Sequence, residues 1–581
     1  MFTRSIYLLV LVFAFAAAVA AQDPPSPVPL ATPFAVDKNG VAPDKVTSGP
    51  PVASSFRSTD RSLPDLGRVG VDLADQKPLT LNEAIVMALE SNRDIEVTRK
   101  TVLMAEFDLK AARGVYEPRF SGLAYYENAT VPNISFFNPT TDRVQSKNFA
   151  GNIGLQAYVP SFGTSISATL DNQRVGTDNL VQIISPQYNS NLRVTVTQPL
   201  FRGRGFDQPR RAIEIAKSNL SLTDAQFRQR AIEIVAAAQR AYWDLTYALR
   251  NLQVQRDAVR DAKAQLEHNR RLVEEGQLAP VDVLAAETQV ANFEQSVYDA
   301  LNTVTVAENA LKNIVSANRT EGIWSKSITP VDSVDLDVPT TTLPEALDAA
   351  LQNRPELQIN QTQKKINAID QKYFRDQQKP QIDLVASYTS TGVGGSLNPN
   401  FINPFCRDNP QDPACQQALQ ALLRLVGGAG STWGDILANK YPTYRVGVQF
   451  NLPLFGNKTA DAQYGRSLVE GDRLSVVHDQ LEQNIQVEVR NALQFVRTAE
   501  ARLRSASISR ENSEKQYESE QRKLDSGQSD IYRVLERQTA LTTARSNELR
   551  AQTELNKSIA DLQRATGNSL KANNVEPVLK K

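Results

Sequence analysis

The sequence contains an internal duplication, and this feature constrains the fold more than any other. Four segments of the first half recur in the same order in the second half. The matches are TLNEAIVMALESNRDI (80–95) with TLPEALDAALQNRPEL (342–357), YEPRFSGLAYY (116–126) with QKPQIDLVASY (378–388), VTVTQPLFRG (194–203) with VGVQFNLPLFG (446–456), and EEGQLAPVDVLAAETQ (274–289) with DSGQSDIYRVLERQTA (525–540). We therefore predict two tandem repeats, at 79–330 and 331–568, followed by a C-terminal tail at 569–581.

Each repeat begins with two helices. Thr80 and Thr342 are positioned to cap a short helix, and Glu83 and Glu345 follow three residues later, which is the spacing of a capping box. A medium helix comes next and ends before Pro118 or Pro380, because proline disfavours helical geometry in the residue before it. The predicted ranges are 81–91 and 93–116 in the first repeat, and 343–353 and 355–378 in the second.

Segments with alternating apolar and polar residues follow, at about 119–199 and about 381–452. Such alternation predicts strands with one wet face and one apolar face. We expect two hairpins, one in each repeat. A further alternating pattern at 149–173 predicts either an extra hairpin in the same sheet or an outer loop, and the sequence leaves both open.

A long helix follows the strands in each repeat, at about 209–274 and about 457–525, and a return helix at 281–316 or 529–566. Apolar residues spaced by seven, from Ala238 to Val273, indicate side-by-side helix packing. A helix of 66 residues is roughly 100 Å long. The medium and return helices together nearly match that length, so we predict a rod two helices thick, with strands at one end and the glycine motifs at the other.

The N-terminal region predicts export. Residues 1–21 have a basic start, a short apolar run and small residues before Gln22, as in a cleaved signal peptide. Residues 22–78 are rich in proline and predict a disordered lead-in. No later apolar run is long enough to span a bilayer as a helix, so a membrane crossing would have to be made by strands.

The remaining composition limits the possible partners. The chain has 64 Lys and Arg residues and 64 Asp and Glu residues, so its formal net charge is zero and does not indicate nucleic-acid binding. The two cysteines, Cys406 and Cys415, close a short proline-containing loop, and we predict a disulfide because exported proteins meet an oxidising compartment. A metal site there is the weaker reading, and we expect neither metal nor cofactor.

The repeated TLxEA segment (TLNEAI and TLPEAL), the proline-bounded strands, the QPLF or LPLF strand ends and the two Gly-x(6)-Val-Leu motifs resemble the TolC-like outer-membrane efflux protein family over 80–567. The resemblance implies a mainly α protein with membrane β-structure: a trimeric α-barrel of coiled-coil helices continued by a transmembrane β-barrel. It implies a place in the Gram-negative outer membrane, in contact with its lipid and extending into the periplasm. It also implies a homotrimeric exit duct for a tripartite efflux pump or a type I secretion system, working with a periplasmic adaptor and an inner-membrane transporter.

The resemblance also implies roles for the motifs at about 276 and about 527, which would be hairpin tips that dock on the adaptor. The residues expected to shape the tips are Gly276, Val283, Leu284, Gly527, Val534 and Leu535. Acidic residues near the second tip ring the lumen in the family. Here Glu536 matches such a position, Arg533 replaces an expected aspartate, and Asp282 fills the equivalent place in the first repeat.

Other functional classes fit less well. The sequence has no GxSxG, P-loop or GxGxxG motif placed between a strand and a helix, so we do not expect an enzyme. A trimeric coiled-coil adhesin or stalk remains the alternative, although its strand region should lie at one chain terminus. A porin would need many short strands and no helices of this length.

Overall fold

The computed structural model describes residues 67–133, 142–333, 338–401, 413, 416–417, 420, 423, 426–453 and 456–575. The predicted signal peptide, most of the predicted lead-in, and Cys406 and Cys415 lie outside the described residues. The described residues belong to a single compact unit that begins at Gly67.

The helices follow the order predicted for two repeats. The first repeat contains α2 (Leu81–Ser91), α3 (Arg93–Arg113), the short η2 (Gly114–Tyr116), α4 (Gln208–Glu274) and α5 (Pro280–Val315). The second contains α6 (Leu343–Asn353), α7 (Pro355–Gln377), α10 (Lys458–Asp525) and α11 (Ile531–Ala565), and α12 (Ser569–Ala572) follows in the tail. The predicted mainly α fold of tandem repeats with long helices is thus confirmed.

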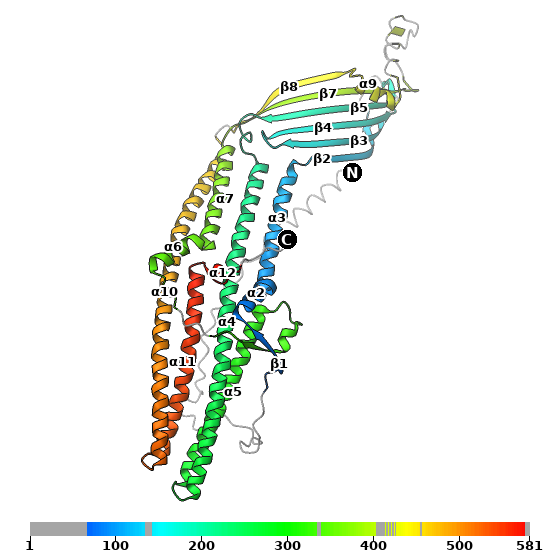
Figure 1. Cartoon of the computed structure of the whole chain (residues 1–581). Helices are drawn as coiled ribbons and strands as arrows, with labels where there is room; N and C mark the ends of the chain where they lie inside the picture. The colour runs from blue at the N-terminus through cyan, green and yellow to red at the C-terminus, as the bar shows by residue number, and fades with distance from the viewer. Residues whose placement is uncertain are drawn as a thin grey trace, which may run out of the picture. The chain divides into compact units, whose positions relative to one another are not determined.

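The long helices are accompanied over most of their length by shorter ones. In the first repeat, α3 packs beside the part of α4 that is nearer the sheet, and α5 packs beside the remainder (Figure 1). In the second repeat, α7 and α11 pack in the same way along α10. The two repeats also contact each other, because α4 packs against both α7 and α11. The arrangement of two helices side by side predicted from helix lengths is therefore confirmed.

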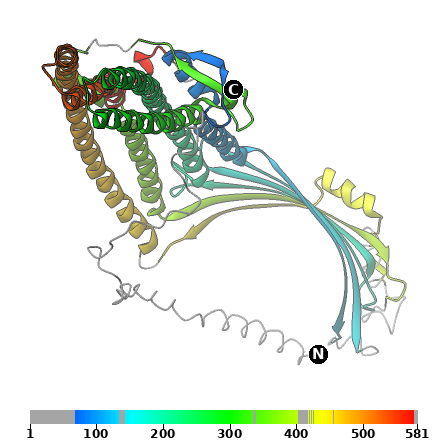
Figure 2. The same ribbon diagram turned by 90° about the horizontal axis from the view of Figure 1, so that it is seen from below.

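One antiparallel sheet of six strands lies at one end of the helices (Figures 1 and 2). Its order along the sheet follows the chain: β2 (Arg119–Pro132), β3 (Arg143–Val159), β4 (Thr164–Thr177), β5 (Ile184–Pro199), β7 (Gln381–Leu397) and β8 (Pro442–Asn451). Strands β5 and β7 pair across the boundary between the repeats. The strands β2 and β8 form the two edges, and each has one unpaired side among the described residues.

The segment 149–173 belongs to this sheet. It contributes to β3 and β4, which pair with each other from Ser146 with Thr177 to Val159 with Thr164. The expectation of one hairpin in each repeat, four strands in all, was wrong, because the first repeat contributes two hairpins. The outer-loop alternative for 149–173 is also excluded. Continuous pairing on both sides satisfies the backbone groups of the extra strands, which is why they lie within the sheet.

A second, two-stranded sheet lies beside the helices. Strand β1 (Asp72–Leu79) pairs in parallel with β6 (Lys326–Pro330), which follows α5. The sequence predicted no regular structure before Thr80, and the structure differs here. Most residues of β1 are exposed, so the segment lacks the alternation that predicts a strand. Its partner lies far along the chain, where a local pattern cannot indicate it.

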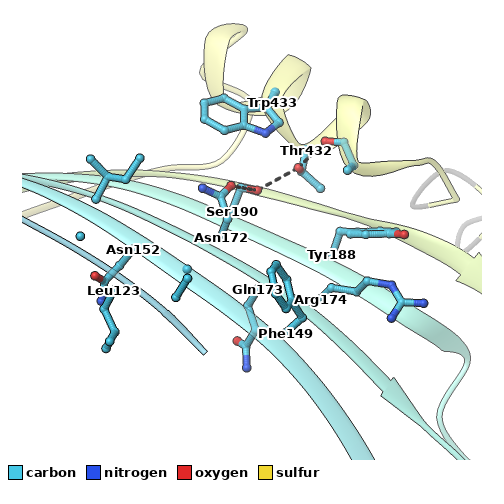
Figure 3. Close-up of a pocket in the computed structure, with 15 residues that line it drawn as sticks. Leu123, Phe149, Asn152, Asn172, Gln173, Arg174, Tyr188, Ser190, Thr432 and Trp433 are labelled. Atoms are coloured by element: carbon cyan, nitrogen blue, oxygen red, sulfur yellow. Dashed lines mark hydrogen bonds between the residues drawn. The ribbon is translucent and has the colours of Figure 1, made fainter. Parts of the chain in front are cut away.

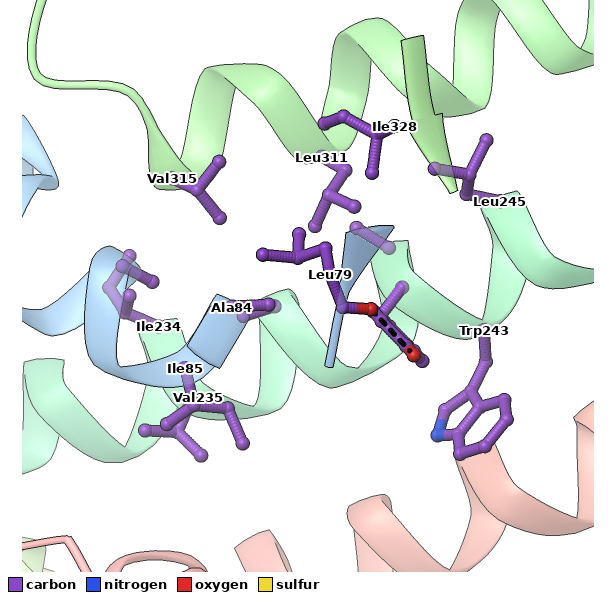
Figure 4. Close-up of a cluster of buried hydrophobic side chains, with 14 of the residues drawn as sticks. Leu79, Ala84, Ile85, Ile234, Val235, Trp243, Leu245, Leu311, Val315 and Ile328 are labelled. Atoms are coloured by element: carbon purple, nitrogen blue, oxygen red, sulfur yellow. Dashed lines mark hydrogen bonds between the residues drawn. The ribbon is translucent and has the colours of Figure 1, made fainter. Parts of the chain in front are cut away.

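The largest apolar core lies where this small sheet meets α2, α4 and α5 (Figure 4). Leu79 from β1 and Ile328 from β6 are buried with Leu245 and Leu311. The hydroxyl of the buried Tyr242 donates to Asp332 Oδ2 at 2.7 Å and lies 3.1 Å from the Leu79 carbonyl oxygen. Burial raises the pKa of this phenol, so Tyr242 remains a neutral donor at physiological pH.

A buried ion cluster fastens the start of the described chain to the same region. Arg68 lies 2.9 Å from Glu308 Oε2, and Lys312 lies 3.6 Å from Glu308 Oε1. Glu308 also accepts a hydrogen bond from the backbone of Ile328. Burial lowers the pKa of Lys312, although the neighbouring Glu308 opposes this. A buried carboxylate needs such partners because an unpaired charge is costly inside a protein.

Candidate functional site

The two helical hairpins, α4–α5 and α10–α11, turn at the end opposite the sheet (Figure 1). We call residues 274–284 the first tip and residues 525–535 the second tip. The tips lie near each other, since Gln289 of α5 donates a 2.8 Å hydrogen bond to Thr539 of α11. Ala285 of α5 also packs against the apolar residues of the second tip. The two motifs that match in sequence are therefore brought together in space.

Both long helices end in the same glycine-dependent geometry. Gly276 has φ +75° and Gly527 has φ +73°. At the first tip, the amide of Gly276 donates to Val273 and that of Gln277 to Leu272. The second tip repeats the pattern, with Gly527 donating to Leu524 and Gln528 to Lys523. This is a Schellman motif, which satisfies the last helical carbonyls and needs a residue that tolerates positive φ.

Carboxylates cap the return helices, but they do so from different positions. At the first tip, Asp282 Oδ2 accepts from the backbone of Ala279 at 3.1 Å, and Pro280 occupies the first turn of α5. At the second tip, Asp530 is itself the N-cap, and its Oδ1 accepts from the backbone of Arg533 at 2.9 Å. Each carboxylate satisfies an amide that the helix leaves free and complements the positive end of the helix dipole.

The apolar tip residues divide into buried and exposed groups. Val534 is fully buried and Leu535 is 8% exposed, and both pack with Leu524 and Ile531. Val283 is half-buried beside the core of the first hairpin. Leu284, the sequence equivalent of Leu535, is 62% exposed. The matched pair thus occupies two different environments.

Sequence reasoning missed two exposed apolar residues at the tips. Val281 is 57% exposed and Tyr532 is 58% exposed. They occupy equivalent positions, two residues after Ala279 and Asp530, which begin the return helices. The sequence places an apolar residue at this position in both repeats, but it does not specify which first-turn residues are covered, since Ile531, the neighbour of Tyr532, is only 2% exposed. Val281, Tyr532 and Leu284 are the three large apolar residues exposed at the described tips.

The three residues considered for the lumen do not form one carboxylate cluster. Asp282 is occupied by capping. Arg533 Nε lies 3.3 Å from Asp530 Oδ2, so an aspartate in the tip compensates its charge. Glu536 is exposed and lines a shallow groove between α10 and α11 with Ser509, Ser513 and Thr539. Asp282 and Arg533 are thus engaged by other residues of the tips. Among the described tip contacts, none engages the carboxylate of Glu536.

A further acidic residue stabilises the second turn. The hydroxyl of Ser529, within the tip, donates to Glu520 of α10, and Lys523 lies 3.2 Å from the other carboxylate oxygen. The hydrogen bond from Ser529 and then that from Lys523 hold the pKa of Glu520 below its usual value. Glu520 therefore remains ionised at neutral pH and ties the turn to the helix that precedes it.

The sheet at the opposite end has two chemically distinct faces. Across the six strands, one row of paired residues reads Phe120, Leu155, Ala168, Val194, Tyr388 and Tyr444. The next row, on the other face, reads Ser121, Gly154, Thr169, Arg193, Thr389 and Thr443. We call these the apolar face and the polar face. Such a sheet suits a boundary between an apolar medium and water.

None of the described helices combines the length and the apolar character needed to cross a membrane. Among the described residues, His, Cys, Asp and Glu side chains nowhere gather in threes as a metal site would need.

One family model and several solved structures match this chain. The family model described as outer membrane efflux protein matches residues 143–317 and 346–568. No curated protein matches the sequence. Several solved structures are similar. The outer-membrane channel OprN is 16% identical with a TM-score of 0.59, covering 89% of this chain and 99% of its own.

Two further channels match comparably. The CmeC outer membrane channel of Campylobacter jejuni is 16% identical with a TM-score of 0.60, covering 85% of this chain and 90% of its own. The MtrE outer membrane channel of Neisseria gonorrhoeae, solved in an open state, is 15% identical with a TM-score of 0.54, covering 84% and 89%. At these identities the structures establish a shared fold.

Proposed function

The chain belongs to the outer membrane efflux protein family, and from this premise we propose that it is the exit duct of a tripartite efflux pump or a type I secretion system. It is an outer-membrane efflux channel of the TolC-like type and extends into the periplasm. The finer proposal concerns its assembly and its partners. The single observation that carries it is the separation of a two-faced sheet from paired hairpin tips by helices of 67 and 68 residues.

The open sheet supports the proposal of a homotrimer. One chain leaves β2 and β8 as edges, and an edge within lipid would leave backbone groups without partners. Joining β8 of one chain to β2 of the next removes every edge when the ring closes. The polar face then lines the lumen and the apolar face contacts lipid. The helices of three chains would continue this barrel as a tube.

The tips support the proposal of end-on docking with a periplasmic adaptor, which in turn contacts an inner-membrane transporter. Val281, Leu284 and Tyr532 expose apolar area at the far end of the two hairpins. Exposed apolar residues gathered in this way are typical of protein contact surfaces. Gly276 and Gly527 shape the turns that present these side chains, and Val283, Val534 and Leu535 brace them from within.

Site-specific photo-crosslinking in cells tests the docking proposal. A photoreactive amino acid at position 284 or 532 should form adducts with a periplasmic protein. The same amino acid at Val306 is the matched control, because Val306 is also 62% exposed and lies on α5 away from the tip. Equal adduct yields at 284 and 306, or adducts at 306 alone, would contradict docking through the tips.

We also propose that Glu536 favours cations at the periplasmic entrance, because a ring of three carboxylates concentrates cations by its local field. Arg533 offsets part of this field, while Asp530 compensates Arg533. Glu536→Gln should lower the ratio of cation to anion permeability in planar bilayers. Asp282→Asn is a poorer test, because it also weakens the cap of α5. An unchanged permeability ratio in Glu536→Gln channels would remove the idea.

The alternative of a coiled-coil adhesin or stalk fits the fold less well. Its strand region should lie at one chain terminus, whereas β2–β5 and β7–β8 lie between helices in both repeats. A stalk would also have no use for a sheet with one apolar and one polar face.

A further inference from the structure

The short helix α9 (Ala429–Leu437) lies against the apolar face of the sheet, although it belongs to the connection between β7 and β8 (Figure 2). Its buried residues, Thr432 and Ile436, face the strands. The Thr432 hydroxyl lies 2.9 Å from that of Ser190, and the Ser390 hydroxyl donates to the Ile436 carbonyl at 3.1 Å (Figure 3 shows the first contact). Ser190 and Ser390 both lie on the apolar face.

Glycines allow this close approach. A Cβ on Gly392 would lie 2.0 Å from the Thr432 carbonyl oxygen, and a Cβ on Gly394 would lie 2.6 Å from the Ser431 hydroxyl. Neither glycine has positive φ, so close packing against α9 is the requirement they meet. The helix is therefore fitted to the sheet rather than resting on it.

A groove of about 610 Å³ lies between α9 and the strands β2 to β5. Trp433 borders it on the helix side, and Phe149, Arg174 and Tyr188 border it on the sheet side (Figure 3). Its floor is lowered by small residues at neighbouring positions of β2 and β3, namely Gly122, Ala124 and Gly151. The groove is lined mainly by apolar atoms, and it opens on the same face as the row that contains Phe120 and Val194.

The charged strand residues on this face all have one sign, while Asp435 of α9 pairs with Lys440 at 3.1 Å. Following the strand pairing, the charged residues of the apolar face in β2–β5, β7 and β8 are Arg143, Lys147 and Arg174. All three lie toward the end of the sheet that is away from the helices, and Lys147 and Arg174 are exposed. Asp178, in the turn after β4, is occupied by the backbone amide of Gln145. The polar face, by contrast, carries Glu127, Asp171 and Asp383 as well as arginines.

We propose that this groove binds one acyl chain of a phosphorylated lipid of the outer membrane, with the lipid phosphate held by Arg174 and Lys147. The inference rests on the proposed orientation, in which the apolar face meets lipid. Trp433 (42% exposed) and Leu437 (84% exposed) extend the lipid contact from α9. Tryptophan is favoured at a membrane interface, and a basic residue there attracts anionic headgroups. The groove is continuous with the lipid-facing surface, and its basic end selects an anionic occupant.

Fluorescence quenching by brominated lipids tests this proposal. The chain has three tryptophans, so the full chain with Trp243→Phe and Trp324→Phe reports on Trp433 alone. In vesicles of mixed lipid, brominated phosphatidylglycerol should quench Trp433 at a lower mole fraction than brominated phosphatidylcholine. Each basic residue contributes about a fivefold preference, so Arg174→Gln and Lys147→Gln should each lower the preference by about that factor.

One control variant and one groove-filling variant show whether the lipid preference arises in the groove. Arg193→Gln removes a charge from the polar face of the same sheet and should leave the preference unchanged. Gly151→Leu should fill the groove and abolish the preference without altering charge. Native mass spectrometry of the unmodified protein, counting anionic lipid retained per trimer, gives a second readout that does not depend on the tryptophan substitutions.

Equal quenching by the two lipids, no quenching of Trp433, or an equal effect of Arg193→Gln would each overturn the groove proposal. Conductance of the same protein in planar bilayers separates this outcome from failure of the proposed function. A conducting channel without lipid preference overturns the groove alone, whereas a protein that never conducts overturns the duct.

Discussion

At the scale of single residues, each repeat fastens the junction of its first two helices to the end of its return helix, but the two repeats use different side chains for this contact. Asn92, at the junction of α2 and α3, donates to the carbonyl of Ile314 near the end of α5. Its sequence equivalent, Arg354, donates to the carbonyl of Ala565 at the end of α11. Arg354 also pairs with Glu356 and Glu488. The duplicated architecture is thus kept while the chemistry of the junction has diverged.

Replacing Arg354 should destabilise the second repeat. Arg354 is 9% exposed and joins α7, α10 and α11. Arg354→Met should lower the free energy of unfolding by about 2 kcal/mol, the value of a hydrogen-bonded charge in a buried site. Thermal unfolding monitored by circular dichroism checks this. Arg473→Met, which removes an exposed pair with Glu470 on α10, should have little effect on stability. An equal loss of stability in both variants would contradict the stabilising role of Arg354 at the helix junction.

The capping boxes should make stability sensitive to acid. The backbone amide of Thr80, and then its hydroxyl, hold the pKa of Glu83 below the usual 4.5, and Thr342 does the same for Glu345. Because the folded pKa is depressed, this stabilisation is present above about pH 4.5 and is lost as the pH falls through the folded pKa. The Tm difference between the native protein and Glu83→Gln/Glu345→Gln should therefore shrink below that pH. A Tm difference that stays constant down to pH 3 would contradict this role of the two glutamates.

At the scale of elements, the two tip glycines and Gly465 of α10 should respond to substitution by alanine in opposite directions. Gly276→Ala and Gly527→Ala force alanine into positive φ and should each cost about 1 kcal/mol. Gly465 lies inside α10 with open space around its Cβ position, so Gly465→Ala should stabilise by about 0.5–1 kcal/mol. Thermal unfolding of the three variants checks both signs. Stabilisation by Gly276→Ala would show that the turn is not fixed as described.

Helices were predictable from the sequence because their signals are local. Thr80, Pro118, Gly276 and Gly527 each mark a helix boundary through the chemistry of a few neighbouring residues. The sheet was less predictable. The strands β3 and β4 contain Asn, Gly and Ser at positions that interrupt the alternation, and whether they join the sheet depends on partners in β2 and β5.

The site was predictable in part for the same reason. Gly276 and Gly527 act through backbone geometry, which the sequence specifies. Whether Leu284 and Leu535 are buried depends on how the two hairpins pack, and the neighbouring hairpin covers only the second. The helix α9 was missed because its apolar residues, Trp433, Ile436 and Leu437, look like part of a loop until the sheet is present to receive them.

At the scale of the whole molecule, the extra hairpin changes the expected barrel. In the proposed trimer, six strands from each chain make eighteen, where four from each would make twelve. Barrel diameter grows roughly in proportion to strand number, so the barrel should be about 1.5 times as wide as one of twelve strands. Electron microscopy of trimers in nanodiscs measures this width directly. A barrel of the narrower width would show that β3 and β4 leave the wall on assembly.

Deleting residues 143–177 gives a matched comparison. The deletion removes β3 and β4 and leaves β2 able to meet β5, since the two run antiparallel in the sheet. The barrel of this variant should shrink toward the width of twelve strands, while the helical tube keeps its diameter. A variant that trimerises with an unchanged barrel width would contradict the assignment of β3 and β4 to the wall.

The parallel pairing of β1 with β6 has a consequence for how the protein is made. Asp72 pairs with Lys326, which lies 254 positions later in the chain. A ribosome adds about 5–20 residues per second, so β1 waits roughly 10 to 50 s before its partner exists. During that delay β1 has no partner strand, and an unpaired strand can pair with the edge of another sheet. The hydrophilic character of Asp72–Pro78, which made the strand hard to predict from the sequence, should also disfavour pairing with other chains during that delay.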